Sequence, residues 1–469
     1  MQGGIDNIKH VYLIGIGGIG MSALARYFKA SGRDVCGYDK TPTLLTSELI
    51  SEGIAVHYHD GVEMLPAFLT GPEINSEVLI IYTPAIPKDH AELVYLETKG
   101  YRMYKRSEVL GLITGSSRTI AVAGTHGKTT TSAMIAHILK DSGTDCTAFL
   151  GGISSNYNTN LLLGSGNPDK EWVVVEADEY DRSFLTLFPQ ISLITSLDAD
   201  HLDIYGNHTD MIASYSQFAG QTRAGGRLII KTGLKLTCDT GAAWTYSISG
   251  DADFTATDIT IKNHKYHFSI REREGIQNDL VLSWPGRHNV ENAVAAYAAT
   301  RAAGVSIPAI KKALSCFKGV KRRFDYQVNS EKITYIDDYA HHPEELKATI
   351  QSVRELYPGE KIVGIFQPHL YSRTRDFVDG FGKSLSLLDE LILLDIYPAR
   401  EKPMPGVSSA IILDKVTIPN KIISSKDKVI DKVLSSEARV ILTLGAGDID
   451  QLVKPLKDAL TLKYKVQTA

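Results

Sequence analysis

The chain has 469 residues, of which 43% are hydrophobic and 22% charged, and its formal net charge is −4. Its length predicts about three domains, and its composition is that of an ordinary globular protein. The slightly acidic balance offers no basic surface, so we expect no nucleic-acid partner. The cysteines show no spacing for a disulfide framework or a zinc site; they are Cys36, Cys146, Cys238 and Cys316.

A leader peptide and a membrane span are not predicted. The apolar run Val11–Ile14 is short and leads directly into glycines, without a basic leader or a small-residue cleavage site. No apolar stretch reaches the roughly 18–20 residues of a membrane span. We therefore expect a cytoplasmic protein with no membrane partner.

The first predicted domain, residues 1–106, begins with a glycine-rich turn. The strand Val11–Ile14 leads into Gly15-x-Gly17-x-x-Gly20, where a helix begins, and a second strand ends at Asp39. Glycines let the backbone approach a diphosphate at a helix N-terminus. A nicotinamide dinucleotide and a nucleotide-sugar diphosphate satisfy this pattern equally well, so the residues alone leave both open.

The second predicted domain, residues 107–318, carries the most informative motif, Gly124-Thr125-His126-Gly127-Lys128-Thr129-Thr130-Thr131. It lies between the strand-like residues 120–122 and a helical pattern, the setting of a phosphate-binding loop. Lys128 would reach the β- and γ-phosphates of ATP, and the Thr129 hydroxyl would ligate Mg²⁺. Val122 stands where a strict Walker A motif has its first glycine, so the loop is a shortened variant.

Two acid-rich segments follow predicted strands of the same domain. Glu176 comes after the run 172–175, and His201 comes after the run 191–197. Because parallel strands deliver their carboxyl ends to one edge of an open sheet, Thr129, Glu176 and His201 are the candidate Mg²⁺ ligands. Magnesium prefers oxygen ligands, so His201 has a structural, aspartate-paired alternative, and Glu176 has the alternative of a solvated loop acid.

The rest of the chain completes the second domain and forms a third. Alternating residues between Thr245 and Leu282 predict an antiparallel β insertion, and residues 286–292 open an alanine-rich helix closed by Gly304. A basic hinge then leads into the third predicted domain, residues 319–469. Its four strand-like runs alternate with helices, and they are 333–336, 362–366, 391–394 and 440–444.

Groups suited to a nucleotide or a carboxylate follow the first two of these runs. Asp338 is suited to ribose hydroxyls, and Arg373 to a bidentate contact with a carboxylate. The adjacent His341 and His342 favour hydrogen bonding over a shared metal ion. Arg323, in the hinge, would stabilise phosphoryl transfer at the γ-phosphate once the third domain closes.

In this order, the motifs resemble the successive signatures of the Mur ligase family. The matching segments span nearly the whole chain, and they are Gly124–Thr131, Glu176–Ser183, Asp200–Asp203, His288–Asn292 and Asp338–His341. Residues 15–22, 337–343 and 367–373 are most similar to the branch that adds L-alanine. The resemblance implies an α/β protein of three domains. These are a Rossmann-like N-terminal domain, a central P-loop ATPase-like parallel sheet with a β insertion, and a Rossmann-like C-terminal domain.

The resemblance also implies an activity, an ADP-forming ligase of cytoplasmic peptidoglycan synthesis. It would join L-alanine to the lactyl carboxylate of UDP-N-acetylmuramate through an acyl phosphate, with ATP as substrate and Mg²⁺ as cofactor. The first domain would hold UDP, which removes the nicotinamide alternative. We expect a monomer or a weak homodimer.

Carried onto this chain, the family motifs imply a role for each candidate residue. The UDP-sugar would contact Gly17, Gly18, Ile19, Gly20, Asp39 and Thr83. ATP would contact Gly124, Thr125, His126, Gly127, Lys128, Thr129, Thr130, His288, Asn289, Asn292, Arg323 and Asp338. Thr129, Glu176 and His201 would hold magnesium. L-Alanine would contact Tyr339, His341, His369 and Arg373. The catalytic groups would be Lys128, His201, Arg323 and His341, with either histidine able to serve as general base.

The nearest rival within the family is the murein-tripeptide recycling ligase, which shares the phosphate loop. Residues 367–373 favour the single amino acid over the tripeptide. Several relatives support magnesium with a carbamylated lysine downstream of the residue corresponding to His201, but residues 202–230 contain no lysine. This agrees with the alanine-adding branch. A nicotinamide oxidoreductase and an ATP-driven switch each rest on one glycine motif alone.

Overall fold

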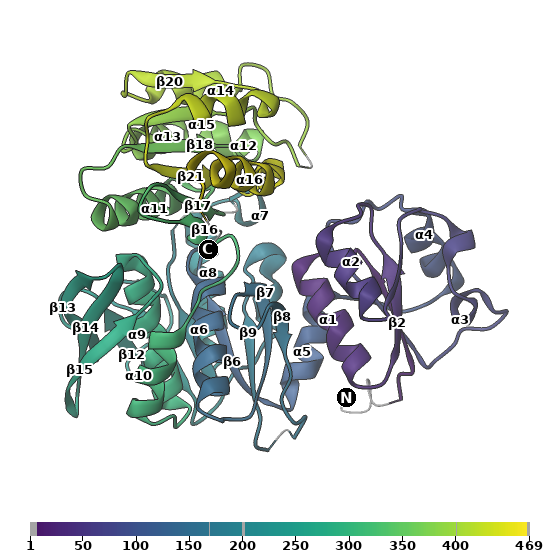
Figure 1. The fold of residues 1–469 in the computed structure, drawn as a ribbon. Helices are drawn as coiled ribbons and strands as arrows, with labels where there is room; N and C mark the ends of the chain where they lie inside the picture. The colour runs from purple at the N-terminus through teal and green to yellow at the C-terminus, as the bar shows by residue number, and fades with distance from the viewer. Residues whose placement is uncertain (1–6, 168, 199–201, 400, 467–469) are drawn as a thin grey trace. The chain divides into compact units, whose positions relative to one another are not determined.

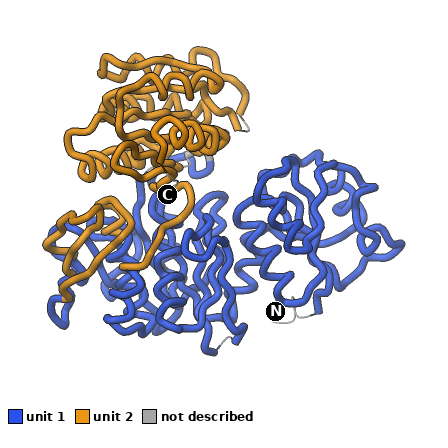
Figure 2. Tube along the Cα trace, in the orientation of Figure 1, with its two compact units in different colours: residues 1–255, 270–276, 292–314 blue, residues 256–269, 277–291, 315–469 orange. Residues whose placement is uncertain are grey.

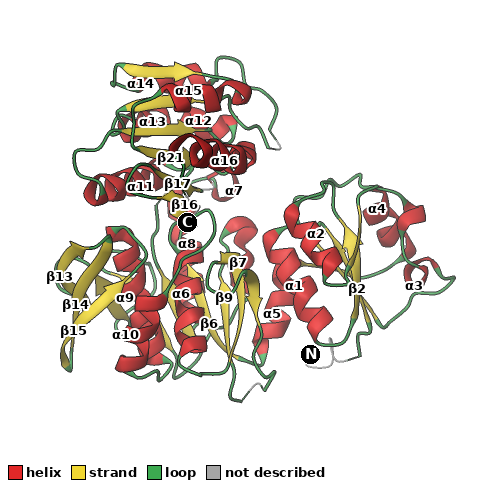
Figure 3. Cartoon of the chain, viewed as in Figure 1, coloured by secondary structure: helices red, strands yellow, loops and turns green. Residues whose placement is uncertain are grey.

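The structure, a computed structural model, describes residues 7–167, 169–198, 202–399 and 401–466. Three sheets with connecting helices organise these residues (Figures 1 and 3). The chain divides into two compact units (Figure 2). Unit 1 comprises residues 1–255, 270–276 and 292–314, and unit 2 comprises residues 256–269, 277–291 and 315–469. The predicted class, α/β with largely parallel sheets, is confirmed.

The N-terminal sheet has five parallel strands in the order β3-β2-β1-β4-β5. The chain moves outward from β1 first to one side and then to the other. The loop after β1 is therefore at a switch point, where open α/β sheets bind ligands. The strands are β1 (His10–Ile14), β2 (Asp34–Tyr38), β3 (Ala55–His57), β4 (Val78–Tyr82) and β5 (Met103–Lys105), and the helices are α1 (Ile19–Ala30), α2 (Leu44–Ser51), α3 (Ala67–Thr70) and α4 (Ala91–Lys99).

In the central sheet, β6 (Arg118–Ala123) lies between β9 (Trp172–Glu176) and β10 (Ile191–Ile194) and is parallel to both. Their carboxyl ends therefore meet beside the loop that follows β6. The predicted strand 191–197 ends earlier, at Ile194, because Thr195 and Ser196 turn toward that loop to make hydrogen bonds.

The central sheet has ten strands in the order β15-β14-β13-β12-β11-β10-β6-β9-β7-β8. The β insertion extends this sheet, and Asn263 and His264, at φ 51° and 58°, form the two-residue turn between β13 and β14. The remaining elements are α5 (Arg106–Gly115), α6 (Lys128–Asp141), β7 (Cys146–Ser154), β8 (Thr159–Leu162), α7 (Leu202–Tyr205), α8 (His208–Gly220), β11 (Arg227–Lys231), β12 (Trp244–Ser247), β13 (Phe254–Lys262), β14 (Lys265–Glu272), β15 (Gly275–Leu282), α9 (Arg287–Ala302) and α10 (Ile307–Cys316).

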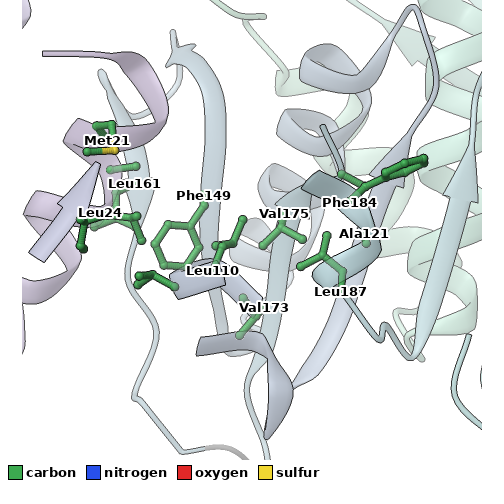
Figure 4. Close-up of a cluster of buried hydrophobic side chains, with 14 of the residues drawn as sticks. Met21, Leu24, Leu110, Ala121, Phe149, Leu161, Val173, Val175, Phe184 and Leu187 are labelled. Carbon is green, nitrogen blue, oxygen red and sulfur yellow. The ribbon is translucent and has the colours of Figure 1, made fainter. Parts of the chain in front are cut away.

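Within unit 1, helix α1 packs against β7 and β8 of the central sheet. Met21 and Leu24 lie beside Phe149 and Leu161 in one buried apolar cluster (Figure 4). Asn160 adds polar contacts, since its Nδ2 donates to Ile19 O at 2.6 Å and to Ser22 Oγ at 2.9 Å. The start of α1, with its glycine turn, is thereby held against the central sheet.

The C-terminal sheet has the order β16-β17-β21-β18-β19-β20, with β16 antiparallel to β17 and the other pairs parallel. The four predicted strands are present, flanked by two further edge strands, β16 and β20. Its strands are β16 (Asp325–Asn329), β17 (Thr334–Asp338), β18 (Ile362–Phe366), β19 (Glu390–Leu393), β20 (Asn420–Ile423) and β21 (Val440–Leu444), and its helices are α11 (Pro343–Leu356), α12 (Tyr371–Asp376), α13 (Val378–Leu385), α14 (Ser409–Lys415), α15 (Val429–Ser435) and α16 (Val453–Tyr464).

Among the helices that the structure describes, none has both the length and the apolar character needed to cross a bilayer.

Candidate active site

The phosphate loop joins β6 to α6 through two glycines with positive φ. Gly124 has φ +132°, and a Cβ there would lie 2.0 Å from Thr195 Oγ1. Gly127 has φ +83°, and its Cβ would lie 2.7 Å from Asn292 Oδ1. Both backbones occupy the left-handed region that glycine favours, and at Gly124 a Cβ would also lie 2.8 Å from the backbone nitrogen of Ser196. The structure thus brings Asn292, a predicted ATP residue, to this loop.

The loop is tied to the end of β10. Ser196 Oγ accepts a hydrogen bond from His126 N at 2.8 Å and lies 2.9 Å from Thr125 Oγ1. Thr195 Oγ1 donates to Ala123 O at 3.1 Å and also to His126 O. These contacts hold the loop's shape before any phosphate binds.

Lys128 is the first residue of α6, and its ammonium group faces both the loop and a carboxylate. Lys128 Nζ donates to Gly124 O at 2.5 Å and to Glu179 Oε1 at 2.8 Å. Burial alone would lower the pKa of Lys128, but the carboxylates of Glu179, Asp178 and Glu176 outweigh it and raise the pKa. The side chain therefore carries a full positive charge at the position predicted for phosphate.

Glu176, at the end of β9, accepts hydrogen bonds from the first turns of α6 and from β7. Thr129 Oγ1 donates to its Oε2 at 3.2 Å, Ser132 Oγ donates to its Oε1 at 3.3 Å, and Gly151 N donates to Oε1 at 2.8 Å. Thr129 and Glu176 thus come together as predicted, and their oxygen atoms suit Mg²⁺. His201, the third predicted ligand, lies outside the described residues, within which no group of three or more His, Cys, Asp or Glu residues forms a metal cluster.

The N-terminal glycine turn is held by backbone and carboxylate contacts. Gly15 N and Ile16 N donate to Tyr38 O at 2.8 and 2.9 Å. Gly17 N donates to Asp39 Oδ2 at 2.8 Å. Asp39 therefore shapes the turn itself in this structure, and its contact with UDP stays a prediction. Gly15 has φ +88°, and its Cβ would lie 2.6 Å from Thr83 Cγ2, so Thr83 is beside the turn.

A cavity of about 290 Å³ lies within unit 1 between this turn and the central sheet. The turn contributes Gly18, Ile19 and Gly20, and the central domain contributes Gly151, Glu176 and Asp178, while Arg106 and Thr83 complete the wall. Sequence reasoning missed Arg106, Gly151 and Asp178. A basic residue just after β5 was the available signal for Arg106, which donates to Asp178 Oδ2 at 2.9 Å.

A second group of predicted residues comes together in unit 2 around Glu345, at the start of α11. Glu345 Oε2 accepts from His341 N at 3.0 Å and lies 3.3 Å from His341 Nδ1, while Oε1 is 3.7 Å from Arg323 Nη1. The guanidinium of Arg323 also lies over the Tyr339 ring at 4.9 Å. Sequence reasoning missed Glu345, because its role depends on the chain folding back onto the hinge.

Asp338 is buried at the end of β17. Its carboxylate accepts hydrogen bonds from Phe324 N and Ala340 N, both at 2.8 Å. Burial raises the pKa of Asp338 to about 6, although Arg323 and these two bonds favour its charged form.

Two histidines of unit 2, His341 and His288, are neutral in the resting structure. Burial lowers the pKa of His341 to about 3 and that of His288, on the first turn of α9, to about 4; Glu345 opposes both shifts and Arg323 adds to them. His341 Nδ1 lies 3.0 Å from Tyr339 O, so Nδ1 carries the proton. Such a weak base is better suited to orienting a ligand than to removing a proton.

The remaining predicted residues of unit 2 are also placed. The rings of His341 and His369 meet edge to face at 6.0 Å. Arg373, on α12, is buried and close enough to lower the pKa of His341. Asn289 Nδ2 donates to Pro285 O at 2.5 Å and is buried, so it supports the start of α9.

Comparison with known proteins defines the class. The chain matches the Mur ligase family, catalytic domain, over residues 10–118, the Mur ligase middle domain over residues 122–300, and the Mur ligase glutamate ligase domain over residues 322–447. The chain belongs to the Mur ligase family and is an ADP-forming ligase.

The relatives at high identity share one name. The UDP-N-acetylmuramate–L-alanine ligase of Flavobacterium psychrophilum is 50% identical over 459 residues, covering 98% of this chain and 100% of the relative. The enzyme of the same name from Porphyromonas gingivalis is 51% identical, covering 97% of this chain and 99% of the relative.

Solved structures agree in fold. The UDP-N-acetylmuramate–alanine ligase of Thermotoga maritima has a TM-score of 0.82 at 28% identity, covering 97% of this chain and 99% of that one. A murein peptide ligase of Psychrobacter arcticus has a TM-score of 0.69 at 23% identity, covering 96% and 98%, and shares the fold.

Proposed function

We propose that this chain joins L-alanine to the lactyl carboxylate of UDP-N-acetylmuramate, forming UDP-N-acetylmuramoyl-L-alanine, ADP and phosphate. The product is a peptidoglycan precursor, so the activity serves cell-wall synthesis and, through it, cell shape and division. One observation carries the proposal. Full-length relatives at about half identity bear this name, and the phosphate loop with Lys128 and Glu176 supplies the chemistry that the name requires.

The reaction must overcome the low reactivity of a carboxylate toward an amine. Transfer of the γ-phosphoryl group to a lactyl oxygen makes an acyl phosphate, whose phosphate is a good leaving group. The neutral α-amine of L-alanine then attacks the carbonyl carbon, and the tetrahedral intermediate expels phosphate. The first step brings two anions together, so positive charge at the loop lowers its barrier.

Lys128 and the loop N–H groups, with Thr125, His126 and Thr130 alongside, would hold the ATP phosphates. Asn292 lies near Gly127 of the same loop. The family resemblance also assigns four further residues to ATP, namely His288, Asn289, Arg323 and Asp338. Thr129 and Glu176 would hold Mg²⁺, which neutralises phosphate charge when bound. The carboxylate oxygens of Glu176 and the hydroxyl oxygen of Thr129 lie together, which supports the assignment of these two residues to Mg²⁺. His201 is the predicted third ligand.

The cavity beside the glycine turn is the proposed place of the sugar nucleotide. Gly17, Gly18, Ile19 and Gly20 would hold the diphosphate, with Asp39 and Thr83 nearby. Glu176 and Gly151 line the opposite wall, which would bring the lactyl carboxylate toward the proposed magnesium site. The cavity lies between the glycine turn and the residues of the central domain, and this position supports the proposed direction of binding.

L-Alanine is proposed to bind among Tyr339, His341, His369 and Arg373. Tyr339 lies under the Arg323 guanidinium, His341 contacts Glu345, and the His369 ring meets the His341 ring, which supports one pocket. His201 and His341 are the two candidates for the general base that the family resemblance offers. We further propose domains at residues 1–106, 107–318 and 319–469, a cytoplasmic location, and a monomer or weak homodimer.

ADP release tests the proposal. With ATP, Mg²⁺ and UDP-N-acetylmuramate present, L-alanine should stimulate ADP release strongly. The murein tripeptide, in its place, should give little stimulation. Preference for the tripeptide would identify the recycling ligase instead, and release that is independent of the sugar nucleotide would reject both.

A further inference from the structure

The mechanism proposed above gives no role to Glu179, yet this carboxylate is the nearest anion to the phosphate-loop lysine. Glu179 Oε1 lies 2.8 Å from Lys128 Nζ. The Glu179 side chain is only 3% exposed and that of Lys128 is 16% exposed. A contact this dry is shielded little by solvent. The lysine therefore begins each cycle paired with a protein carboxylate.

The backbone around Glu179 is shaped to hold this contact. Asp181 and Arg182, both non-glycine, have φ +54° in the turn that begins the 3₁₀ segment η2 (Tyr180–Thr186). Such conformations are costly for L-residues and persist where neighbouring contacts impose them. One of those contacts is Tyr205 Oη, which donates to Glu179 O at 2.6 Å.

Two cations fix the same turn from the side of the N-terminal domain. Arg106 Nη2 donates to Asp178 Oδ2 at 2.9 Å, and Lys105 Nζ donates to Asp181 Oδ2 at 2.6 Å. Asp178 Oδ1 in turn accepts from Tyr180 N at 3.1 Å. With residues on both sides of Glu179 anchored, its carboxylate cannot follow Lys128 far from this position.

We propose that Glu179 is a positioning residue that holds Lys128 in the absence of nucleotide and competes with the ATP phosphates for it. When ATP arrives, Lys128 Nζ exchanges the anchored carboxylate for phosphate oxygens, while the Glu179 charge stays behind. Glu179 thus keeps the ammonium charged and oriented across the empty loop, at the expense of nucleotide affinity. This inference rests on the ATP site of the proposed function.

The test is the affinity for ATP·Mg²⁺ without sugar nucleotide or amino acid, measured by calorimetry on the full chain. Glu179→Gln keeps the shape and a hydrogen-bond acceptor for Lys128 but removes the competing charge. We expect it to lower the Kd for ATP by roughly tenfold, the scale of one charge contact at partial burial. Glu179→Asp, which keeps the charge but withdraws it from Lys128, should fall between the wild type and the glutamine variant.

Asp181→Asn is the matched control, because it removes the same charge from the same turn while its amide oxygen can still accept the hydrogen bond from Lys105 that anchors the turn. Its Kd for ATP should stay at the wild-type value. The Kd for UDP-N-acetylmuramate should not change in Glu179→Gln, whereas a purely structural role for Glu179 would weaken the binding of both ligands.

Weaker or unchanged ATP binding in Glu179→Gln, with the far-UV circular dichroism of the wild type, overturns the competition. Equal tightening in Asp181→Asn also overturns it, because the effect would then be one of general charge. If the wild-type chain binds ATP but the Kd values of the variants differ from those expected here, the inference fails and the proposed function stands. If the wild-type chain binds no ATP, both fail.

Discussion

The charge and the burial of three side chains limit the role that each can have in the proposed reaction. These side chains belong to Lys128, Arg373 and His341. Lys128 is charged and paired, Arg373 is buried in α12, and His341 is neutral because it is buried. Substitutions that keep the local shape separate these contributions.

Lys128→Ala removes the ammonium group from the phosphate loop. We expect kcat to fall by roughly 10²–10³ or more, the scale of losing one preorganised partner of the transition state, with an unchanged circular dichroism spectrum. Lys140→Ala, on the last turn of the same helix, is the control and should keep wild-type turnover. Near-normal turnover in Lys128→Ala would remove the loop from phosphoryl transfer.

Arg373→Lys tests the alanine pocket. L-Alanine offers a carboxylate and little else to bind, and lysine cannot reproduce the two parallel hydrogen bonds of a guanidinium. We expect a sharp rise in the KM for L-alanine, far smaller changes in the other two KM values, and acyl phosphate still trapped by hydroxylamine without alanine. Arg375→Lys, an exposed neighbour paired with Asp376, should change none of them. A joint rise of all three KM values, or loss of trapping, would assign Arg373 to phosphoryl transfer or to structure.

His341 makes the folding stability of the chain depend on pH. The pKa of His341 is about 3 in the fold and about 6.5 in an unfolded chain. Between these values the unfolded chain binds more protons, so stability falls as pH falls. Asp338, with its raised pKa of about 6, acts in the opposite sense above about pH 4.

His341→Gln keeps a hydrogen-bond donor for Tyr339 O but cannot take up a proton. Its Tm should therefore drop less than that of the wild type between pH 7 and pH 5, as followed by thermal unfolding. An equal drop in both proteins would mean that other groups carry the acid sensitivity.

At the scale of elements, the loop between β6 and α6 depends on its glycines and on β10. Gly124→Ala places a Cβ against Thr195 Oγ1 and requires φ +132°, so the loop must move. We expect loss of measurable ATP binding and a lower Tm. Gly143→Ala, just after the same helix, has φ +76° but open space around it. It should lose about 1 kcal/mol of stability from strain alone and keep ATP binding. Normal ATP affinity in Gly124→Ala would show that the loop tolerates rearrangement.

The elements themselves differ in how well the sequence predicts them. Buried parallel strands such as β6, β9 and β18 are continuous apolar runs, so they are predicted nearly to the residue. The edge strands β16 and β20 are mixed in polarity and were missed. Residues 286–292, which the sequence places at the opening of an alanine-rich helix, do form the start of α9 from Arg287.

The candidate site shows the same division. The glycine loops and Glu176 follow strands directly, so local order in the sequence predicts them. Arg106 and Glu179 act through partners distant in the chain, and no local pattern distinguishes them from solvated charges. Glu345 contacts the nearby His341 and His342 as part of a capping box, and only its approach to Arg323 depends on a distant partner. The roles assigned to His288, Asn289 and His369 come from the family resemblance and stay predictions.

At the scale of the whole molecule, three sheets serve three tasks in the proposed reaction. The switch point of the first faces a cavity that the second also lines, within unit 1. The second carries the phosphate loop. The third, in unit 2, carries Tyr339, His341, His369 and Arg373, the residues proposed to hold the amino acid. The proposed reaction has one central step: an oxygen of the lactyl carboxylate is phosphorylated and then leaves as part of the released phosphate.

Oxygen transfer tests that step most directly. UDP-N-acetylmuramate labelled with ¹⁸O in the lactyl carboxylate is incubated with the chain, ATP, Mg²⁺ and L-alanine, and the released phosphate is analysed by mass spectrometry. The account predicts one carboxylate oxygen in each phosphate, together with UDP-N-acetylmuramoyl-L-alanine. Phosphate without the label, or ADP release with no alanine-containing product, would contradict it.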